Sequence, residues 1–491
     1  MGELMMKNLF KQNDIRGKVS TDSNHINEVF AYKLGFAIGL KFNPKKVHIG
    51  FDMRPSSPAL VLAVHRGLCA HNLTIEVKSL GNVPSPMLYH YSKDADVSIM
   101  VTASHNPYDE NGFKICLRNG LPVGRDTGLL DLVHLMETIP YSNNIIHPPI
   151  DVTGDSSMYL NSYAKQYLSK IKLTRSKIRK HVFVVDCNNG VGVRYFSMLR
   201  EAFPEHLWLA INADTALPPV HEGNPLVKEC WADFLEERRH LPEWSTLKHD
   251  VVGFMFDGDA DRLGVHAMNP IPFDAIGVLL VQSNNFKKVC YDLRCNFRIP
   301  RFLRDNNIES YETKVGHTYV KQTMRDHDMD FGWELSGHCY YREHLYTDTP
   351  LLAIRDLVLL LESQDSTLDV LVEPYWGMWA SEEINFSMST TLEMDMVCNN
   401  IKNLFDDIDS VNTLDGTKVL FKDGSWILAR KSGTQNVVRI IVEGTTNQQR
   451  DTLLSKAQSF IEGCGGVIVD TLQPDGPVIN LAFSNNNERV H

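Results

Sequence analysis

The sequence has little that would suit a nucleic-acid-binding, membrane-spanning or zinc-binding protein. Its 49 lysines and arginines are outnumbered by 60 aspartates and glutamates, which gives a formal net charge of −11, whereas general nucleic-acid binders carry a basic balance. The apolar stretch Val29–Leu40 is interrupted by Lys33, and no run approaches the roughly 18–20 residues that a membrane span needs. The nine cysteines are scattered and form no CxxC pair. We therefore expect no nucleic-acid or membrane partner.

Signals for export and for common nucleotide sites are also missing. The first residues, MGELMMKNLF, resemble neither a signal peptide nor an N-myristoylation signal, because Met6 stands where the latter needs serine or threonine. No GxxxxGK[ST] motif occurs, which excludes a Walker P-loop. With the unpaired cysteines, these absences favour a cytoplasmic location.

The chain is organised as a series of domains. Its 491 residues are too many for one compact core, so three or four domains are expected. An apolar run that ends in aspartate recurs at Val47–Asp52, Val182–Asp186 and Val289–Asp292. After the first run, Ser56–Ala70 has apolar residues at helical spacing, as in the βα unit of an α/β domain. The recurrence predicts related α/β domains in series, although unrelated βα units can produce the same pattern.

Domain boundaries follow from changes in composition. The segment Pro140–Ser157 is rich in Asn, Pro, Ser and Asp, which is typical of a linker. From about Leu371, short apolar runs alternate with turns before a helical segment at Gln448–Ile461, as in a small α+β domain. The sequence predicts three related α/β domains and a smaller C-terminal α+β domain, with ranges 1–148, 149–263, 264–369 and 370–491.

A candidate nucleophile lies in TASHNPYDENGFKI, Thr102–Ile115, which follows an apolar strand and is rich in turn formers. Ligands of open α/β sheets bind beyond the carboxyl ends of strands. Ser104, flanked by His105 and followed by Lys114, can act as a nucleophile whose neighbours handle protons and charge. The Gly-x-Ser-x-Gly elbow of hydrolases is absent. The alternative is a plain Asn-Pro turn with a serine near a strand end.

A candidate cation site follows the strand VVGFMF. In DGDADR, the carboxylates of Asp257, Asp259 and Asp261 alternate with small residues, so a tight loop can turn all three around a hard cation. Arg262, the next residue, suits a phosphate oxygen. The loop is not an EF-hand, because this arginine stands where an EF-hand requires glycine. The alternative is a solvated acidic turn.

Two further segments suit a phosphosugar. In GWELSGH, Glu334 and Ser336 are spaced to contact vicinal hydroxyls, and His317 and His338 can act as acid or base near neutral pH. In RKSGTQNVVR, a turn offers amides, hydroxyls and two guanidinium groups to a phosphate; its residues are Arg430, Ser432, Gly433, Thr434 and Arg439. Structural histidines and a charged surface turn are the respective alternatives.

Together the four segments supply the parts that phosphoryl transfer needs. With NDIRG at Asn13–Gly17, they resemble in order, over nearly the whole chain, the motifs of the α-D-phosphohexomutase superfamily, and most of all its phosphomannomutase/phosphoglucomutase branch. The resemblance implies four domains around a central cleft. It also implies reversible interconversion of a hexose 1-phosphate and a hexose 6-phosphate, with mannose or glucose as the sugar.

The resemblance also implies roles for individual residues. Ser104 is expected to be a phosphoserine, and Mg²⁺ to be bound by that phosphate and the three aspartates. A hexose 1,6-bisphosphate is expected as the intermediate, held during its turn by the Arg430–Arg439 loop. Arg16 and Lys114 are expected beside the transferring phosphoryl group, and Arg262 and Arg294 along the cleft. The resemblance says nothing of the oligomeric state.

Two other functions fit parts of this pattern. A phosphoglucosamine mutase shares the serine and metal loops, and a non-catalytic paralogue could bind phosphosugars as a sensor or scaffold. The intact Ser104 and aspartates speak against the paralogue. Departures from the superfamily pattern are Asn13 before DIRG, Trp333 next to Glu334, Gln435 and Asn436 after the SGT turn, and TDTP at Thr347–Pro350. Among these, Trp333 is expected to reshape the sugar pocket.

Overall fold

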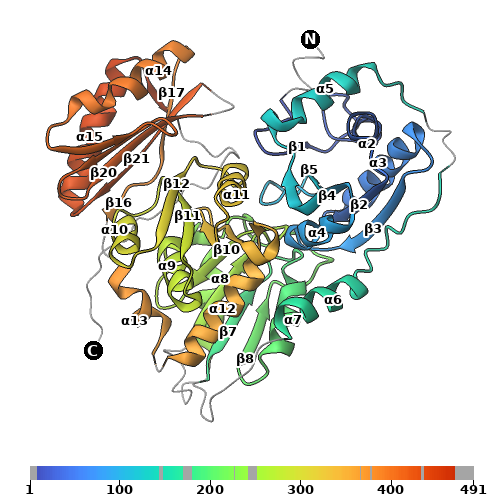
Figure 1. Ribbon diagram of the computed structural model, residues 1–491, viewed down its shortest axis with the longest axis horizontal. Helices are drawn as coiled ribbons and strands as arrows, with labels where there is room; N and C mark the ends of the chain where they lie inside the picture. Colours follow the sequence, from blue (N-terminus) through green and yellow to red (C-terminus); the bar gives the residue numbers. More distant parts are fainter. Residues whose placement is uncertain are drawn as a thin grey trace.

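Four β-sheets follow one another along the chain, each with its own helices (Figure 1). The computed structural model describes residues 8–142, 147–169, 180–225, 227–241, 251–364, 366–375, 379–432 and 436–469. In Figure 1 the first unit (blue) lies on the right, the second (green) and third (yellow, with α12, Pro350–Ser363, and α13, Leu368–Val372, in orange) lie in the middle, and the fourth (orange to red) lies at the upper left. Among the described helices, none has the length and apolar character needed to cross a membrane.

The helices and strands of the first two units are as follows. The first unit comprises β1 (Ile15–Lys18), α2 (Glu28–Phe42), β2 (Lys46–Phe51), α3 (Ser57–His71), β3 (Glu76–Asn82), α4 (Ser85–Tyr91), β4 (Val97–Val101), β5 (Glu110–Leu117), β6 (Leu121–Pro122) and α5 (Leu129–Thr138). The second comprises α6 (Ser157–Leu168), β7 (Val182–Asp186), α7 (Val193–Ala202), β8 (Leu207–Ile211), α8 (Ala232–His240), β9 (Val251–Phe256) and β10 (Leu263–His266).

The last two units continue the series. The third comprises α9 (Phe273–Asn284), β11 (Lys288–Asp292), α10 (Arg298–Asp305), β12 (Glu309–Thr313), α11 (His317–Asp326), β13 (Phe331–Trp333), β14 (Cys339–Tyr341), β15 (Thr347–Asp348), α12 (Pro350–Ser363) and α13 (Leu368–Val372). The fourth comprises β16 (Trp379–Ala380), β17 (Ile384–Ser387), α14 (Thr391–Asn400), β18 (Ile408–Asn412), β19 (Thr417–Phe421), β20 (Trp426–Lys431), β21 (Val437–Gly444), α15 (Asn447–Gly463) and β22 (Val467–Val469).

The first three sheets share one strand order. It reads β5-β4-β2-β3 in the first unit, β10-β9-β7-β8 in the second and β14-β13-β11-β12 in the third. In each of these orders the last three strands are parallel, and the first strand joins the second as an antiparallel hairpin. The repeated aspartate-ending runs of the sequence form the equivalent strands β2, β7 and β11. The prediction of related α/β domains in series is confirmed.

This shared order places the sequence motifs at equivalent positions. The loop with Ser104 joins β4 to β5, the DGDADR loop joins β9 to β10, and the ELSGH loop joins β13 to β14. All residues of β4, β7 and β9 are buried, as expected for parallel strands that are covered on both faces. The apolar residues are therefore buried in the strands, and the polar residues lie in the hairpin loops that connect them.

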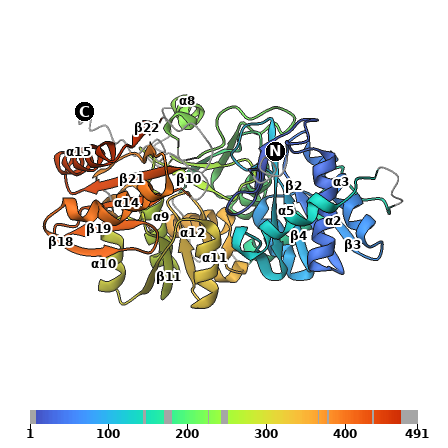
Figure 2. The same ribbon diagram turned by 90° about the horizontal axis from the view of Figure 1, so that it is seen from above.

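The fourth unit has a different architecture. Its antiparallel sheet runs in the order β18-β19-β20-β21-β17-β22 and carries α14 and α15, so the predicted C-terminal α+β domain is confirmed. Trp426, Leu428 and Ile441 of this sheet form a buried cluster with Leu293 of the third unit. Seen from above, the fourth and first units lie at opposite ends of the molecule (Figure 2).

One element extends further than the sequence indicated. Strand β10 pairs with β9 and carries the second sheet to His266, whereas the sequence-based range of that domain ends at residue 263. The reason is that LGVH is short and follows the acidic loop directly, so its apolar pattern is too brief to be read as a strand. The helices expected at Ser56–Ala70 and Gln448–Ile461 are present as α3 and α15.

Candidate active site

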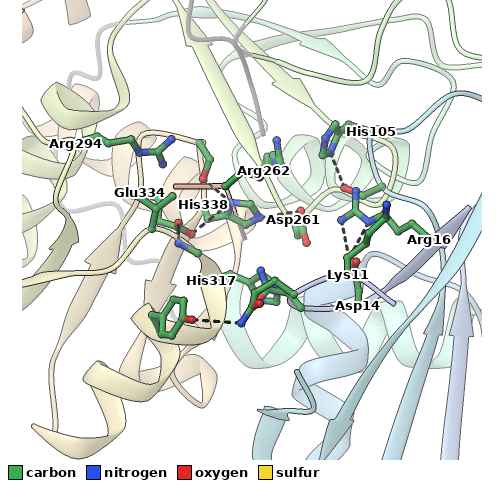
Figure 3. Close-up of a pocket in the computed structure, with 18 of the residues that line it drawn as sticks. Lys11, Asp14, Arg16, His105, Asp261, Arg262, Arg294, His317, Glu334 and His338 are labelled. Atoms are coloured by element: carbon green, nitrogen blue, oxygen red, sulfur yellow. Dashed lines mark hydrogen bonds and ion pairs between the residues drawn. The ribbon is translucent and has the colours of Figure 1, made fainter. Parts of the chain in front are cut away.

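A cavity of about 270 Å³ lies where the four units meet. Figure 3 shows Arg294 and Glu334 on one side of it, Arg16 and His105 on the other, and Asp261 in between. The lining side chains are mostly polar or charged. They are Lys11, Gln12, Asn13, Asp14, Arg16, Ser104, His105, Asn106, Lys114, Asp261, Arg262, Arg294, Val315, Gly316, His317, Tyr319, Glu334, Ser336, His338, Glu383, Asp415, Arg430, Lys431, Ser432 and Arg439.

Ser104 is held in a constrained position at the β4–β5 hairpin. Its φ of 54° lies in the left-handed region, which non-glycine residues adopt rarely. Its backbone N–H donates to Thr102 Oγ1 (2.8 Å), and its side-chain Oγ donates to Asp257 Oδ2 (2.7 Å) and lies 3.3 Å from His105 Nδ1. The residue is 2% exposed. The hydroxyl is therefore aimed at the aspartate loop of the second unit and is well shielded from water.

A buried arginine that the sequence reading missed holds the serine loop in place. Arg54 pairs with Asp52 and donates to four backbone carbonyl oxygens, those of Ser104 (2.9 Å), Asn106 (2.7 Å), Pro107 (2.5 Å) and Glu110 (2.8 Å). The only sequence signal is its place two residues after an aspartate that ends a strand, which Arg294 shares. Arg54 thus supplies hydrogen-bond donors to backbone carbonyl oxygens of the serine loop that would otherwise be buried without a partner.

The aspartate loop packs directly against the serine loop. A Cβ atom at Gly258 would lie 2.5 Å from the Ser104 carbonyl oxygen, so only glycine allows this approach. Asp257 Oδ1 accepts the backbone N–H groups of Asp261 (3.1 Å) and Arg262 (3.2 Å), which closes the loop on itself. The three aspartates are buried, and each offers a carboxylate oxygen within 4.8 Å of the others. This is the inward-facing arrangement that the spacing predicted.

The electrostatics of the three carboxylates favour a bound cation. Burial and the neighbouring carboxylates raise the pKa of Asp257. Burial would also raise the pKa of Asp261, but Lys114 and His338 lower it well below its usual range. Lys114 on β5 contacts both Asp259 (2.6 Å) and Asp261. Asp259 Oδ1 is buried without a hydrogen-bond partner among the described residues. The donor set of carboxylate oxygens fits Mg²⁺.

Positive charge also surrounds Ser104. Arg16 donates to Asn106 Oδ1 (2.9 Å) and is paired with Asp14. Arg262 Nε lies 3.9 Å from Asp257 Oδ2, and its Nε and Nη1 atoms are buried without a hydrogen-bond partner among the described residues. Burial and these two arginines lower the pKa of His105 well below its usual value. A neutral imidazole and several cations therefore face the serine, as a dianionic phosphoryl group would require.

The β13–β14 hairpin brings its polar residues to the same cavity. Glu334 Oε1 accepts the backbone N–H of Gly316 (3.0 Å), and Ser336 Oγ lies 2.9 Å from His338 Nδ1. His338 Nε2 lies 3.3 Å from Asp261 Oδ1. This ring therefore connects the ELSGH loop (residues 334–338, called the sugar-type loop below) to the aspartate loop. Burial lowers the pKa of His317, whose ring stacks 6.2 Å from that of His338. All four predicted residues lie together.

Two of the predicted departures are located by the structure. Trp333 does not line the cavity: its ring lies in the core against Gly277, and its Nε1 donates to Asp274 Oδ1 (3.2 Å). The expected reshaping of the pocket by Trp333 is therefore wrong, because alternation along β13 points it away from the loop. Asn13 lines the cavity, where its Oδ1 accepts from Thr318 Oγ1 (2.8 Å) across the first and third units.

Three arginines of the third and fourth units, Arg294, Arg430 and Arg439, also line the cavity. Arg294 lines the cavity and is held bidentately by Asp292 (2.6 and 3.1 Å). Arg430 and Arg439 are opposite each other on β20 and β21, and each lies 3.6 Å from a different carboxylate oxygen of Glu383. Sequence reading missed this glutamate. Ser432 lines the cavity, while Gly433, Thr434 and Gln435 lie outside the described residues.

A polar cluster of the second unit lies beside the serine loop. His221 Nε2 lies 3.2 Å from Asp186 Oδ2, at the end of β7. In the same connection, a Cβ at Gly223 would lie 3.0 Å from the Cα of His105. Burial lowers the pKa of His221, but Asp186 and Cys230 outweigh it and raise that pKa to about 10.

This pair predicts a pH-dependent stability. Because the pKa of His221 in the folded protein is raised from 6.5 to about 10, its stabilisation is fully present below pH 6.5 and is lost as the pH rises to about 10. We expect the melting temperature of His221→Gln to lie below that of the wild type at pH 7, and the difference to shrink towards pH 10. Thermal denaturation at several pH values measures this difference. A gap that stays constant or widens would contradict the assignment.

Comparisons with known proteins identify the same four domains along the chain. Four domain models of the phosphoglucomutase/phosphomannomutase family match the chain: alpha/beta/alpha domain I at residues 7–136, domain II at 159–269, domain III at 274–377 and the C-terminal domain at 390–456. The phosphomannomutase of Methanocaldococcus jannaschii is 28% identical over 471 residues, which cover 94% of this chain and 98% of that protein.

Two further relatives extend the comparison. The phosphomannomutase/phosphoglucomutase of Pseudomonas syringae is 27% identical over 496 residues, with 97% of each chain covered. A crystal structure of a phosphoglucomutase/phosphomannomutase family protein from Burkholderia thailandensis superposes with a TM-score of 0.79 at 25% identity, covering 94% of this chain and 99% of that one. Since the domain models match most of its length, the chain belongs to the phosphoglucomutase/phosphomannomutase family.

Proposed function

We propose that this protein interconverts a hexose 1-phosphate and a hexose 6-phosphate, with mannose, glucose or both as the sugar, through a phosphorylated Ser104. The observation that carries the proposal is that Ser104 Oγ, 2.7 Å from Asp257, lies in a cavity lined by residues of all four units. Such a cavity can hold a sugar together with two phosphate groups. Family membership supports the same reaction.

The first half of the reaction is transfer from the enzyme to the sugar. The P–O bond to Ser104 breaks as a P–O bond forms to the free hydroxyl of the sugar monophosphate, which gives a hexose 1,6-bisphosphate. The proton of that hydroxyl passes to a nearby base, for which the rings of His317 and His338 are the candidates. Burial lowers the pKa of His317, so its ring is neutral near pH 7.

Charge around the transferring group would come from the chain and from Mg²⁺. Arg16, Lys114, Arg262 and neutral His105 line the cavity with Ser104 and would stabilise the phosphoryl oxygens. Asp257, Asp259 and Asp261 would hold Mg²⁺ together with the phosphate on Ser104. The ion would supply further neutralisation of charge in the transition state.

The second half requires the bisphosphate to turn round. Arg430, Ser432, Gly433, Thr434 and Arg439 would bind the phosphate that is not reacting; this set is called the phosphate anchor below. Arg294 would line its path, and Glu334 and Ser336 would bind sugar hydroxyls in both orientations. The P–O bond at the other end of the sugar then breaks as a P–O bond forms to Ser104 Oγ, and the released sugar oxygen takes back the proton held by the base. This restores the phosphoenzyme and releases the isomerised monophosphate.

A mutase assay across four sugars tests the proposal. The purified protein is incubated with the 1-phosphates of mannose, glucose, glucosamine and ribose, and the products are separated. We expect turnover of mannose 1-phosphate, glucose 1-phosphate or both. A clear preference for glucosamine would assign the protein to the aminosugar branch instead, and no turnover of any of them would identify a phosphosugar-binding paralogue.

Removing one arginine of the phosphate anchor should weaken catalysis on every sugar. Losing a charge-assisted hydrogen-bond pair costs about 1.5–3 kcal/mol, which is roughly a ten- to hundredfold loss. We expect Arg430→Ala to lower kcat/KM by that factor on both mannose and glucose substrates, because the anchor binds phosphate and not sugar. Steady-state kinetics on the two sugars measure it. A loss on one sugar alone, or no loss, would contradict the assignment.

The sugar-binding role of Glu334 gives a contrasting expectation. Its carboxylate lies inside the cavity and contacts the backbone of Gly316. We expect Glu334→Ala to change the ratio of kcat/KM between mannose and glucose substrates, because the hydroxyls that distinguish these sugars are its expected partners. The same assay provides the measurement, and Arg430→Ala is its control. Equal losses on both sugars would place the glutamate outside hydroxyl recognition.

A further inference from the structure

A carboxylate stands between the two arginines of the phosphate anchor. Glu383 precedes β17, which pairs with β21, while β21 pairs with β20, so three neighbouring strands bring Glu383, Arg439 and Arg430 together (Figure 1). Oε2 of the glutamate lies 3.6 Å from Arg430 Nη2, and Oε1 lies 3.6 Å from Arg439 Nη1. The three side chains are only 10–12% exposed, and all line the cavity.

At these distances Glu383 attracts the two guanidinium groups by charge but forms no close hydrogen bond with either. Charge-assisted hydrogen bonds between guanidinium and carboxylate groups measure about 2.7–2.9 Å, and both contacts are longer. The field of Glu383 also reaches Arg294: burial lowers the pKa of that arginine, but Asp292, and less strongly Glu383, raise it. The carboxylate therefore offsets positive charge from both the third and the fourth units.

Such a residue opposes phosphate binding at close range. A phosphate dianion held by Arg430 and Arg439 would stand within a few ångströms of the Glu383 carboxylate in a nearly buried site, where like charges repel with little screening. A site built only for affinity gains nothing from this carboxylate. A site that must release and rebind the same molecule within one cycle gains speed, because uniformly tight binding slows the step in which the ligand leaves.

We propose that Glu383 is a positioning residue that limits the affinity of Arg430 and Arg439 for phosphate and thereby sets the rate at which the bisphosphate intermediate leaves these two arginines to turn round. The inference rests on the proposed function, since only a mutase needs the intermediate to exchange its two phosphates at one site. Glu383 acts through Arg430 and Arg439, and it takes no part in the breaking or forming of a P–O bond.

The test removes the charge and keeps the shape. Glu383→Gln should bind inorganic phosphate about tenfold more tightly, as measured by calorimetry on the purified protein. Its kcat and KM for the hexose 1-phosphate should both fall about tenfold, so that kcat/KM stays nearly unchanged. In the Arg430→Ala background the same substitution should bring no gain in phosphate affinity, which locates the effect at the anchor.

A neighbouring glutamate provides the matched control. Glu382 is exposed and does not line the cavity, so Glu382→Gln makes the same change in net charge one residue away. Equal or weaker phosphate binding by Glu383→Gln, an equal gain in Glu382→Gln, or tighter binding with an unchanged kcat would each overturn the proposal. Phosphate binding is measured without turnover, so an inactive wild type would reject the mutase function and leave the affinity comparison standing.

Discussion

Ser104→Ala is expected to lose nearly all mutase activity, by about 10⁴-fold or more, while the protein still folds. The reason is that the reaction needs an oxygen nucleophile at this position, and Ser104 Oγ lies in the cavity beside Asp257. Alanine removes only the hydroxyl and so leaves the packing of the loop in place. Steady-state kinetics and a thermal melt of the variant measure the two parts of this expectation.

Peptide mass spectrometry of the active wild type completes the test of Ser104. We expect a phosphoryl group on this residue, since the nucleophile must be phosphorylated before a cycle begins. Ser98→Ala offers a matched control, because Ser98 is a buried serine on β4 that does not line the cavity. This variant should keep its activity. Active wild-type enzyme with Ser104 bare and the phosphate elsewhere would refute the assignment.

Asp259→Asn is expected to lower kcat by about 10³-fold, chiefly through loss of Mg²⁺. Removing one of three carboxylates weakens the hold on a cation that dehydrates reluctantly, and metal neutralisation of a phosphoryl transition state contributes several kcal/mol. Asp259 also pairs with Lys114, so the neutral variant changes the charge on both sides of the phosphoryl group. Kinetics at increasing Mg²⁺ concentrations would separate the two effects, because only the loss of the ion is partly reversed.

Chelation of the wild type provides the control for Asp259. We expect EDTA to abolish activity and added Mg²⁺ to restore it, while the melting temperature of the chelated protein stays high enough to show a folded chain. If the wild type worked equally well with and without EDTA, the three aspartates would have to act as charge partners of Lys114 alone.

Much of the fold and the positions of three candidate loops could be predicted from the sequence, because each of these loops follows a recognisable apolar strand. TASHNP, DGDADR and ELSGH all lie where a strand of a repeated unit ends, and their residue types reveal their chemistry without structural help. The internal repeat was visible for the same reason: burial on both faces forces a continuous apolar run in β2, β7 and β11.

What the sequence could not supply are partners brought together by the fold. Arg54 lies 50 residues before the carbonyl of Ser104 that it binds, and Glu383 meets Arg430 and Arg439 only through the pairing of three strands. Neither has a local pattern of its own, since a single arginine or glutamate near a strand is common on any protein surface. The direction of the Trp333 side chain could not be predicted either, because all three residues of β13 are buried and the sequence does not show which of them face the cavity.

The shared strand order of the first three units makes the catalytic apparatus modular. Nucleophile, aspartate loop and sugar-type loop each occupy the hairpin at the same place in its own sheet, so each is anchored by strands that the other two do not use. On the proposed function, exchanging Glu334–Ser336 within the β13–β14 hairpin would change the sugar contacts, whereas His338 must stay because it contacts Asp261.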